Sequence, residues 1–339
     1  MSFALGLGLT NECNLSCPHC YRAPERLERL ELGEVRRVCE AVPLRSVNLG
    51  TGENGLHPGL RSVLGYLRDR SIPTSISSNG LTIELLSDEE LRALREVEVS
   101  IDFPDEERQD EWRGRGSFGT ALAALERVRR LGIDASIVAV MMRANHDRLA
   151  PIAHLAARYG ATLRVNVYVP VRTAVYAPTY AEHWAAWRML LAETSLVACT
   201  EPILGVVLGR PVSTGCGRST LRVTPAGRVL PCVYWPEAGA AIDVLETQGA
   251  RILEHPAFRD SHQIPRACTG CNFVDACRGG CASRRLLAGR LDQPDEYCPV
   301  ARGDHLQLPC TLAPPRQPLK SSSACTTILT GTRTTPATH

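Results

Sequence analysis

The chain has 339 residues, 44% of them hydrophobic, and a formal net charge of +2 that argues against a nucleic-acid partner. This length allows one large core or two smaller ones, and the sequence has neither a membrane-spanning apolar stretch nor a signal peptide, so we expect a cytoplasmic protein without a membrane partner. Because disulfides are rare in the cytoplasm, the fourteen cysteines favour metal ligation.

The first predicted element is a buried strand over the apolar run Phe3–Leu9, and a cysteine cluster follows it directly. Cys13, Cys17 and Cys20 are spaced C-x3-C-x2-C within LTNECNLSCPHCYR. Three thiolates at this spacing can bind three irons of a [4Fe–4S] cluster and leave the fourth open to a small molecule. The alternative is a structural zinc knuckle, which needs a fourth nearby ligand, and His19 is poorly placed for that role.

This loop resembles the cluster-binding loop of the radical S-adenosylmethionine (SAM) enzymes. The resemblance implies that the open iron binds the amino and carboxylate groups of SAM, and that reduction cleaves SAM to a 5′-deoxyadenosyl radical. It also implies that Tyr21, directly after the motif, belongs to the cofactor site. A flavodoxin- or ferredoxin-type protein would supply the electron.

A helix over Glu34–Ala41 comes next, with Cys39 on its apolar face and therefore predicted in the core. The strand Ser46–Leu49 then runs into the turn Gly50-Thr51-Gly52-Glu53. Glycines let a backbone approach a ligand closely, and a carboxylate can accept a hydrogen bond from an ammonium group. The turn is similar to the family's GGE motif, with the glycine pair interrupted by Thr51. The resemblance assigns Gly50, Gly52 and Glu53 to the methionine part of SAM.

A predicted helix over Pro58–Arg70 leads to the strand Pro73–Ile76 and the turn Ser77–Gly80. Asn79 before a glycine is a turn signal. At the end of a third strand, the turn also resembles a loop of the family that lies beside SAM. The two interpretations of Asn79 are compatible.

The fourth predicted strand, Val97–Ile101, leads into the pattern Ser100-x-Asp102. This S-x-D pattern is similar to one that the family often carries at this point. The resemblance implies that Ser100 and Asp102 lie near the ribose and carboxylate of SAM. The alternative for Asp102 is a helix or turn cap.

Two further strands, Ala135–Met141 and Thr162–Tyr168, are predicted on either side of a helix over Arg148–Tyr159. Strands therefore alternate with helices, which indicates parallel βαβ units. With the family resemblance, the fold class is α/β: a partial (β/α)6 TIM-like barrel over residues 1–198, followed by a small cysteine-rich domain over residues 199–305.

A second set of cysteines occupies that domain, spaced C-x10-G-x4-C, then C-x2-C-x5-C-x3-C, then a final Cys. This order resembles the SPASM extension of radical SAM enzymes, which carries auxiliary iron–sulfur clusters. The resemblance implies three [4Fe–4S] clusters, one that binds SAM and two auxiliary. One auxiliary cluster would be held by Cys268, Cys271, Cys277 and Cys298, and the other by Cys216, Cys232 and Cys281. The alternative is a zinc ribbon, which leaves several of these cysteines without a role.

Gly227 is predicted in a hairpin turn between Leu221–Val223 and Val229–Leu230, which would bring Cys216 and Cys232 together. The fourth ligand of their cluster is left open between the substrate, a water and Cys199.

Cys199 follows a predicted helix over Ala181–Thr194. Three interpretations compete for it: a buried apolar residue, the fourth cluster ligand, or a hydrogen-atom donor to a substrate radical. The last would make Cys199 the catalytic residue of an epimerase.

Residues 306–339 are rich in Pro, Ser and Thr and lack apolar periodicity, so we predict a disordered tail. Cys310 and Cys325 within it are interpreted as incidental. Because Ser/Thr/Cys-rich tails occur in modified peptides, a fused peptide substrate is the alternative.

The resemblance implies a radical SAM oxidoreductase or maturase that abstracts hydrogen from an unactivated C–H bond. Most relatives with this extension modify ribosomal peptides, for example by crosslinking, and we expect a peptide substrate. Because only twelve residues precede Cys13, a leader-peptide-binding module would be a separate protein. The alternative is oxidation or epimerisation of a sugar, nucleoside or antibiotic intermediate in secondary metabolism. A third alternative is a non-catalytic electron carrier, but that role would not require the GTGE or S-x-D patterns.

Overall fold

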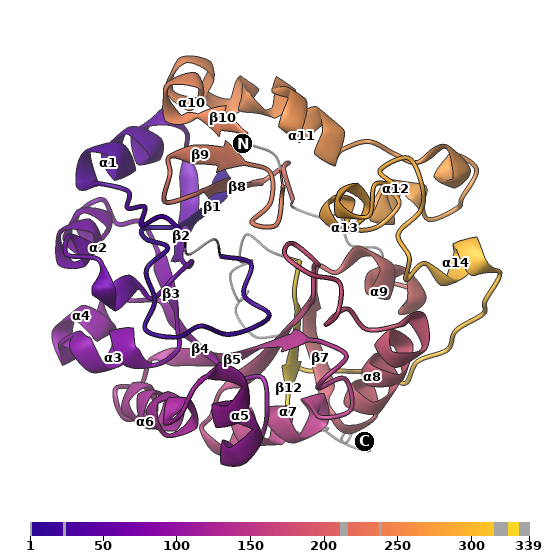
Figure 1. Cartoon of the computed structure of the whole chain (residues 1–339), viewed down its shortest axis with the longest axis horizontal. Coiled ribbons are helices and arrows are strands. Elements are labelled where there is room, and N and C mark those ends of the chain that lie inside the picture. Colours follow the sequence, from indigo (N-terminus) through magenta and orange to yellow (C-terminus); the bar gives the residue numbers. More distant parts are fainter. Residues whose placement is uncertain (1, 23–24, 211–215, 237–238, 315–324, 332–339) are drawn as a thin grey trace.

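The computed structural model describes residues 2–22, 25–210, 216–236, 239–314 and 325–331. Its first half contains strands that pair side by side, each parallel to the next: β1 (Phe3–Leu7), β2 (Leu44–Leu49), β3 (Thr74–Ser78), β4 (Glu96–Ser100), β5 (Asp134–Met141) and β6 (Thr162–Val167). The sheet curves around a central opening, and helices cover its outer side (Figure 1). The predicted α/β class and parallel arrangement are confirmed.

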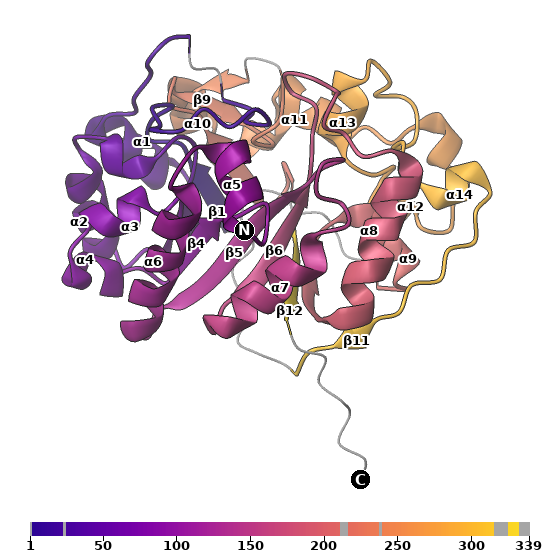
Figure 2. The ribbon, with the colours of Figure 1, turned by 60° about the horizontal axis from the view of Figure 1, so that its bottom comes forward.

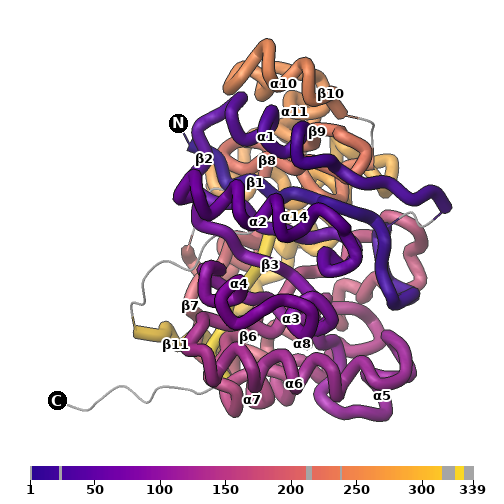
Figure 3. Tube along the Cα trace, turned by 90° about the vertical axis from the view of Figure 1, so that its left-hand side faces the viewer, coloured from indigo at the N-terminus to yellow at the C-terminus, as the bar shows by residue number. Residues whose placement is uncertain are grey.

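The helices between these strands are α1 (Leu32–Ala41), α2 (Leu60–Asp69), α3 (Leu81–Leu85), α4 (Asp88–Arg92), α5 (Glu106–Arg113), α6 (Ser117–Arg130) and α7 (Leu149–Arg158), with a 3₁₀ turn η1 (Asn54–Leu56). Figure 3 shows how α1, α2, α4, α6 and α7 follow one another along the outside of the barrel. Helix α1 illustrates the cause, because Val35, Val38 and Cys39 lie at helical spacing and are all buried. The core position predicted for Cys39 is confirmed.

After β6 come α8 (Tyr180–Glu193), β7 (Ser195–Cys199) and α9 (Pro202–Val207), and then the strands β8 (Thr220–Val223), β9 (Arg228–Leu230) and β10 (Ala240–Ala241). Strands β8 and β9 form the predicted antiparallel hairpin, with Gly227 at a φ of +69° in its turn. Strand β8 also pairs in parallel with β1, so the sheet continues from the barrel into the cysteine-rich region. The predicted division after residue 198 falls at the end of β7.

The cysteine-rich region continues with α10 (Ile242–Gln248), α11 (Pro256–Ser261), α12 (Val274–Cys277), α13 (Ala282–Leu287) and α14 (Pro299–Arg302), and with the 3₁₀ turns η2 (Gly249–Glu254) and η3 (Arg266–Cys268). Figures 1 and 2 show α12, α13 and α14 together on one side of the barrel. In the part of the chain that the structure describes, no helix has both the length and the apolar character to cross a membrane.

The prediction that residues 306–339 are disordered is wrong for part of the tail. Residues Thr311–Leu312 form β11, parallel to β7, and Thr327–Thr330 form β12, which lies antiparallel between β6 and β7. Ile328 and Leu329 in β12 are buried. Threonine and isoleucine favour strands, but this short run is embedded in a composition typical of disorder. Residues 315–324 and 332–339 of the tail lie outside the described residues.

Candidate active site

A pocket with a volume of about 220 Å³ lies at the carboxyl ends of the first strands, where α/β folds bind ligands. The loop after β1, which carries the first cysteines, crosses the opening of the barrel (Figures 1 and 2). The pocket brings together most of the residues predicted for the cofactor site, namely Cys13, Cys17, Cys20, Tyr21, Gly50, Gly52, Glu53, Asn79 and Ser100.

Arg22 and Asn79 hold the cysteine loop in place. The guanidinium of Arg22 donates to the backbone carbonyl of Leu15 over 2.9 Å and to the backbone carbonyl of Asn11. On the other side of the loop, Nδ2 of Asn79 donates to Oδ1 of Asn14 over 2.8 Å. Because Asn79 directly follows β3, this contact ties the loop to the edge of the sheet.

The thiols of the loop are suited to an iron–sulfur cluster rather than to free acid–base chemistry. Burial raises the pKa of Cys17 to about 11 and also raises the pKa of Cys13. Such thiols lose their protons when a metal binds. Among the described residues, no three His, Cys, Asp or Glu side chains are grouped to hold one metal ion. A [4Fe–4S] cluster needs no such group, because each thiolate binds a different iron.

The turn after β2 depends on Gly52 and Glu53. Gly52 has a φ of +62°, and a Cβ there would lie 2.3 Å from the carbonyl oxygen of Glu12, so only glycine fits. The buried carboxylate of Glu53 accepts hydrogen bonds from the backbone N–H groups of Asn79, over 2.8 Å, and Thr82, over 2.9 Å. Glu53 therefore connects the turn after β2 to the loop after β3 at the pocket wall.

Thr51, which interrupts the glycine pair, has a φ of +105°, where glycine is favoured. Its hydroxyl lies 2.9 Å from the hydroxyl of Tyr21 and accepts a hydrogen bond from Arg222. Arg222 also donates to the backbone carbonyl of Gly50. The hydrogen bonds of the Thr51 side chain thus offset a strained backbone and link the turn to β8.

The structure places Asp102 behind the pocket wall rather than in the pocket. Its Oδ2 accepts a hydrogen bond from Nε of Arg113 over 2.8 Å, and its Oδ1 accepts one from the backbone N–H of Val140 over 2.8 Å. Nε2 of His19 lies 3.3 Å from Oδ2. Burial lowers the pKa of His19 to about 4, so this ring is neutral at pH 7, and its Nδ1 accepts a hydrogen bond from Nε1 of Trp112 over 2.7 Å. Arg113 and His19 line the pocket, and Asp102 acts on it through them.

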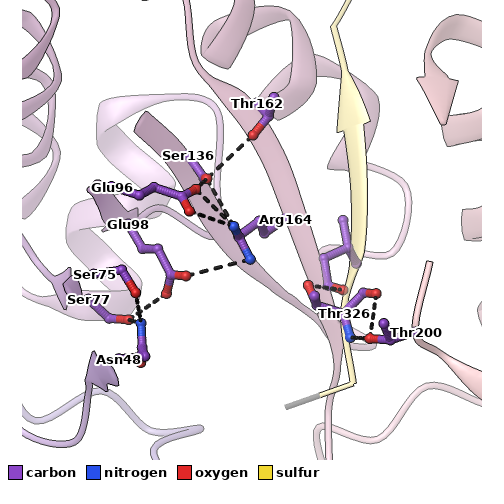
Figure 4. Close-up of polar contacts among 11 residues, drawn as sticks. Asn48, Ser75, Ser77, Glu96, Glu98, Ser136, Thr162, Arg164, Thr200 and Thr326 are labelled. Atoms are coloured by element: carbon purple, nitrogen blue, oxygen red, sulfur yellow. Dashed lines mark hydrogen bonds and ion pairs between the residues drawn. The ribbon is translucent and has the colours of Figure 1, made fainter. Parts of the chain in front are cut away.

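A buried polar network inside the barrel adjoins the pocket (Figure 4). Nη2 of Arg164 lies 2.9 and 2.8 Å from the two carboxylate oxygens of Glu96, and Nη1 lies 3.6 Å from Glu98. Glu98 also accepts a hydrogen bond from the hydroxyl of Ser77 and, unlike Glu96, lines the pocket. The pocket therefore contains a second carboxylate besides Glu53 that can accept hydrogen bonds from a ligand.

The cysteines of the second half form two groups. Cys268, Cys271, Cys277 and Cys298 lie close enough together for each to influence the pKa of another, and burial raises the pKa of Cys268 to about 11. Cys216, Cys232 and Cys281 line a second pocket. The backbone N–H of Gly217 donates to the carbonyl of Pro231 over 3.0 Å, so the hairpin does bring Cys216 and Cys232 together.

Cys199 lines neither pocket. It is the last residue of β7, and its buried thiol lies 3.5 Å from the hydroxyl of Thr327 and 3.5 Å from the backbone carbonyl of Glu201. Burial raises its pKa to about 12. Of the three interpretations of Cys199, this position favours packing.

The first pocket is also lined by Arg113 and by Arg222 and Tyr234, and the last two were not expected from the sequence. Arg222 lies within the apolar strand β8, and a charge in a buried strand is the signal that could have identified it. The ring of Tyr234 meets that of Tyr21 edge-on at 5.4 Å. Because Cys232 lines the second pocket, residues 232–234 connect the two pockets.

Comparisons with known proteins show which family and which relatives this chain resembles. The model of the Radical SAM superfamily matches residues 7–156. The mycofactocin maturase MftC of Mycolicibacterium smegmatis is 30% identical over 316 residues, which cover 86% of this chain and 81% of that protein.

Two solved structures share the fold. Streptococcus suis SuiB bound to its precursor peptide SuiA has a TM-score of 0.66 at 15% identity, covering 88% of this chain and 76% of that one. The structure of anSMEcpe with AdoMet and the Cp18Cys peptide has a TM-score of 0.67 at 18% identity, covering 88% of this chain and 95% of that one.

The fold and the pocket define a partial-barrel enzyme with a cysteine loop at its active-site edge. Together with the relatives, they identify the cofactor chemistry as that of SAM and iron–sulfur clusters. The chain belongs to the radical SAM superfamily, in the group with a cysteine-rich C-terminal extension of the SPASM type.

Proposed function

We propose that this enzyme matures a ribosomally made peptide by abstracting hydrogen from an unactivated C–H bond. One observation carries the proposal: the three thiols of the cysteine loop and the Gly52–Glu53 turn line a single pocket. The relatives support a peptide substrate, because MftC is named a maturase and the SuiB structure holds a precursor peptide. When bound, a [4Fe–4S] cluster and SAM supply the electron and the radical.

The chain's own residues have distinct roles in this proposal. The cluster would be held by Cys13, Cys17 and Cys20, and SAM would be held by Tyr21, Gly50, Gly52, Glu53, Asn79 and Ser100. The carboxylate of Glu53 is suited to accept a hydrogen bond from the ammonium group of SAM. Arg22 holds the loop in position through the carbonyl of Leu15. Asp102 positions Arg113 at the pocket wall.

We also propose two auxiliary clusters, and so three clusters in all, in a domain over residues 199–305 that follows the barrel domain of residues 1–198. The grouping of the cysteines into a set of four and a set at the second pocket supports this count. The proposed partners are a flavodoxin- or ferredoxin-type reductant and a separate protein that binds the leader of the peptide.

The experiment uses anaerobically reconstituted enzyme, SAM, dithionite and short peptides encoded beside its gene. We expect 5′-deoxyadenosine and a modified peptide from the wild type, and neither from Cys13→Ala/Cys17→Ala/Cys20→Ala. The exposed thiol of Cys310 provides a matched control, because Cys310→Ala removes a cysteine outside both pockets. Deoxyadenosine formation that only a sugar or nucleoside stimulates would contradict the peptide assignment.

A further inference from the structure

The second pocket contains a cysteine from the C-terminal tail. The Sγ of Cys325 lies 3.3 Å from the Sγ of Cys216, although the two residues are 109 positions apart in the chain. Neither thiol is in a disulfide. Cys325 lines the pocket together with Cys216, Cys232 and Cys281. The interpretation of Cys325 as incidental, made from the composition of the tail, does not fit this position.

We propose that Cys325 is the fourth cysteine ligand of the auxiliary cluster assigned to Cys216, Cys232 and Cys281. This inference rests on the proposed function, which places a cluster at those three residues. A fourth thiolate completes the set that encloses a [4Fe–4S] cluster with protein ligands only.

The remaining cysteines do not compete for this role. Cys39 is on the buried face of α1, Cys199 lies against Thr327, and Cys310 is exposed. None of the three lines the second pocket.

Strand β12 fixes the position of Cys325. The next residue, Thr326, donates its backbone N–H to Oγ1 of Thr200 over 2.9 Å, and its carbonyl accepts a hydrogen bond from the N–H of Thr200 over 2.8 Å (Figure 4). Thr327 then pairs with Cys199 on one side and Val165 on the other. Because β12 is hydrogen-bonded to a strand on each side, its backbone is fixed. The position of Cys325, just before β12, at the second pocket is therefore fixed too.

A buried network connects this point to Cys281. Glu201, which follows Thr200, accepts a hydrogen bond from Nη2 of Arg284 over 2.8 Å. Arg284 also donates to Oδ2 of Asp295 over 2.8 Å, and the same carboxylate accepts the backbone N–H of Cys281 over 2.8 Å. Glu201, Arg284 and Asp295 are all buried. A satisfied buried network is rigid, so Cys281 and Cys325 are held at fixed relative positions.

A complete ligand set limits what this cluster can do. Without an open iron, it cannot bind the substrate directly and is suited to electron transfer. Its location agrees with that role, because Cys232 lines the cluster pocket while Val233 and Tyr234 line the SAM pocket. A cluster bound only by cysteines would thus lie at the edge of the site where the substrate radical would form.

The test uses the full-length chain in the Cys13→Ala/Cys17→Ala/Cys20→Ala background, in which only the auxiliary clusters remain. Cys325→Ala and Cys325→Ser are compared with Cys310→Ala as the matched control. Each protein is reconstituted with ⁵⁷Fe, assayed for iron, and studied by Mössbauer and paramagnetic resonance spectroscopy with and without imidazole. We expect the background and Cys310→Ala to have identical spectra that imidazole does not change.

In both Cys325 variants we expect the signal of one auxiliary cluster to shift, one iron site to become distinct, and imidazole to alter that site. Unchanged spectra in the Cys325 variants would overturn the inference. An imidazole response in the background protein would also overturn it. This second measurement needs no substitution at Cys325, so it does not depend on how the variants fold. A background protein with about four irons instead of about eight would overturn the proposed pair of auxiliary clusters. If two auxiliary clusters form and replacing Cys325 changes the spectrum of neither, this inference alone is overturned.

Discussion

Asp102 and Arg113 form a buried ion pair at the wall of the active-site pocket. Nε of Arg113 lies 2.8 Å from Oδ2 of Asp102, and Arg113 lines the pocket while Asp102 does not. The Asp102 side chain is fully buried, so each charge depends on the other for compensation. This relationship makes Asp102 a positioning residue for the guanidinium that faces the ligand.

We expect Asp102→Asn to lower the free energy of unfolding by about 3–5 kcal/mol, because the guanidinium of Arg113 stays buried without its partner. The asparagine oxygen can still accept the hydrogen bond from Val140, but its NH2 group cannot accept from Arg113, so the charge and the hydrogen bond to Arg113 are lost together. Thermal unfolding midpoints of the reconstituted proteins measure the loss. The double variant Asp102→Asn/Arg113→Gln should be more stable than the single variant, and an equal or lower midpoint would contradict the pairing.

Glu53→Gln should weaken SAM binding about tenfold to a hundredfold. A hydrogen bond to a charged group contributes about 1.5–3 kcal/mol, and about 1.4 kcal/mol corresponds to a tenfold change. Isothermal titration of the reconstituted enzyme measures the affinity, and the exposed residue Glu89 supplies the control Glu89→Gln. If Glu53→Gln binds SAM as the wild type does, the carboxylate only connects the loops at Asn79 and Thr82.

Iron analysis should find about twelve irons per chain in the wild type and about eight in the triple variant of Cys13, Cys17 and Cys20. The reason is that the triple variant removes one cluster and leaves the two cysteine groups of the second half intact. Iron and sulfide assays after anaerobic reconstitution give the counts. A wild-type value near four, or one zinc per cysteine group, would disprove the assignment.

The barrel was predictable because each of its elements carries a local signal. The apolar run Phe3–Leu9 became β1, and the helical spacing of Val35, Val38 and Cys39 became the buried face of α1. The hairpin at Gly227 was predictable for the same reason, since a turn signal lies between two short apolar strands. These features need no knowledge of distant residues.

Two features of the site depend on distant contacts and were not predictable. Asp102 lies two residues beyond the end of β4, where strand alternation no longer fixes the direction of a side chain, and Arg113 determines it instead. Cys325 reaches the second pocket only because β12 pairs with β6 and β7, more than a hundred positions earlier in the chain. No local sequence pattern predicts such a pairing.

The thermal stabilities of two Thr51 variants should separate the effect of backbone strain from that of the side-chain hydrogen bonds. Thr51→Ala keeps the unfavourable φ of +105° and loses the contacts to Tyr21 and Arg222, so it should be the least stable protein. Thr51→Gly loses the same contacts but relieves about 1–3 kcal/mol of strain, so its thermal midpoint should lie above that of Thr51→Ala. The reverse order would show that the backbone at Thr51 is unstrained.

Leu329 in β12 is fully buried, whereas Leu312 in β11 is 45% exposed. Leu329→Ala should lower the free energy of unfolding by about 2–5 kcal/mol, because it leaves a cavity in the main hydrophobic core, to which Leu329 belongs. Leu312→Ala should change it by less than about 0.5 kcal/mol. Both residues belong to the tail, so the pair tests directly whether part of that tail is built into the barrel. Equal thermal midpoints for the two variants would mean that β12 contributes nothing to the core, and they would also remove the support on which the position of Cys325 depends.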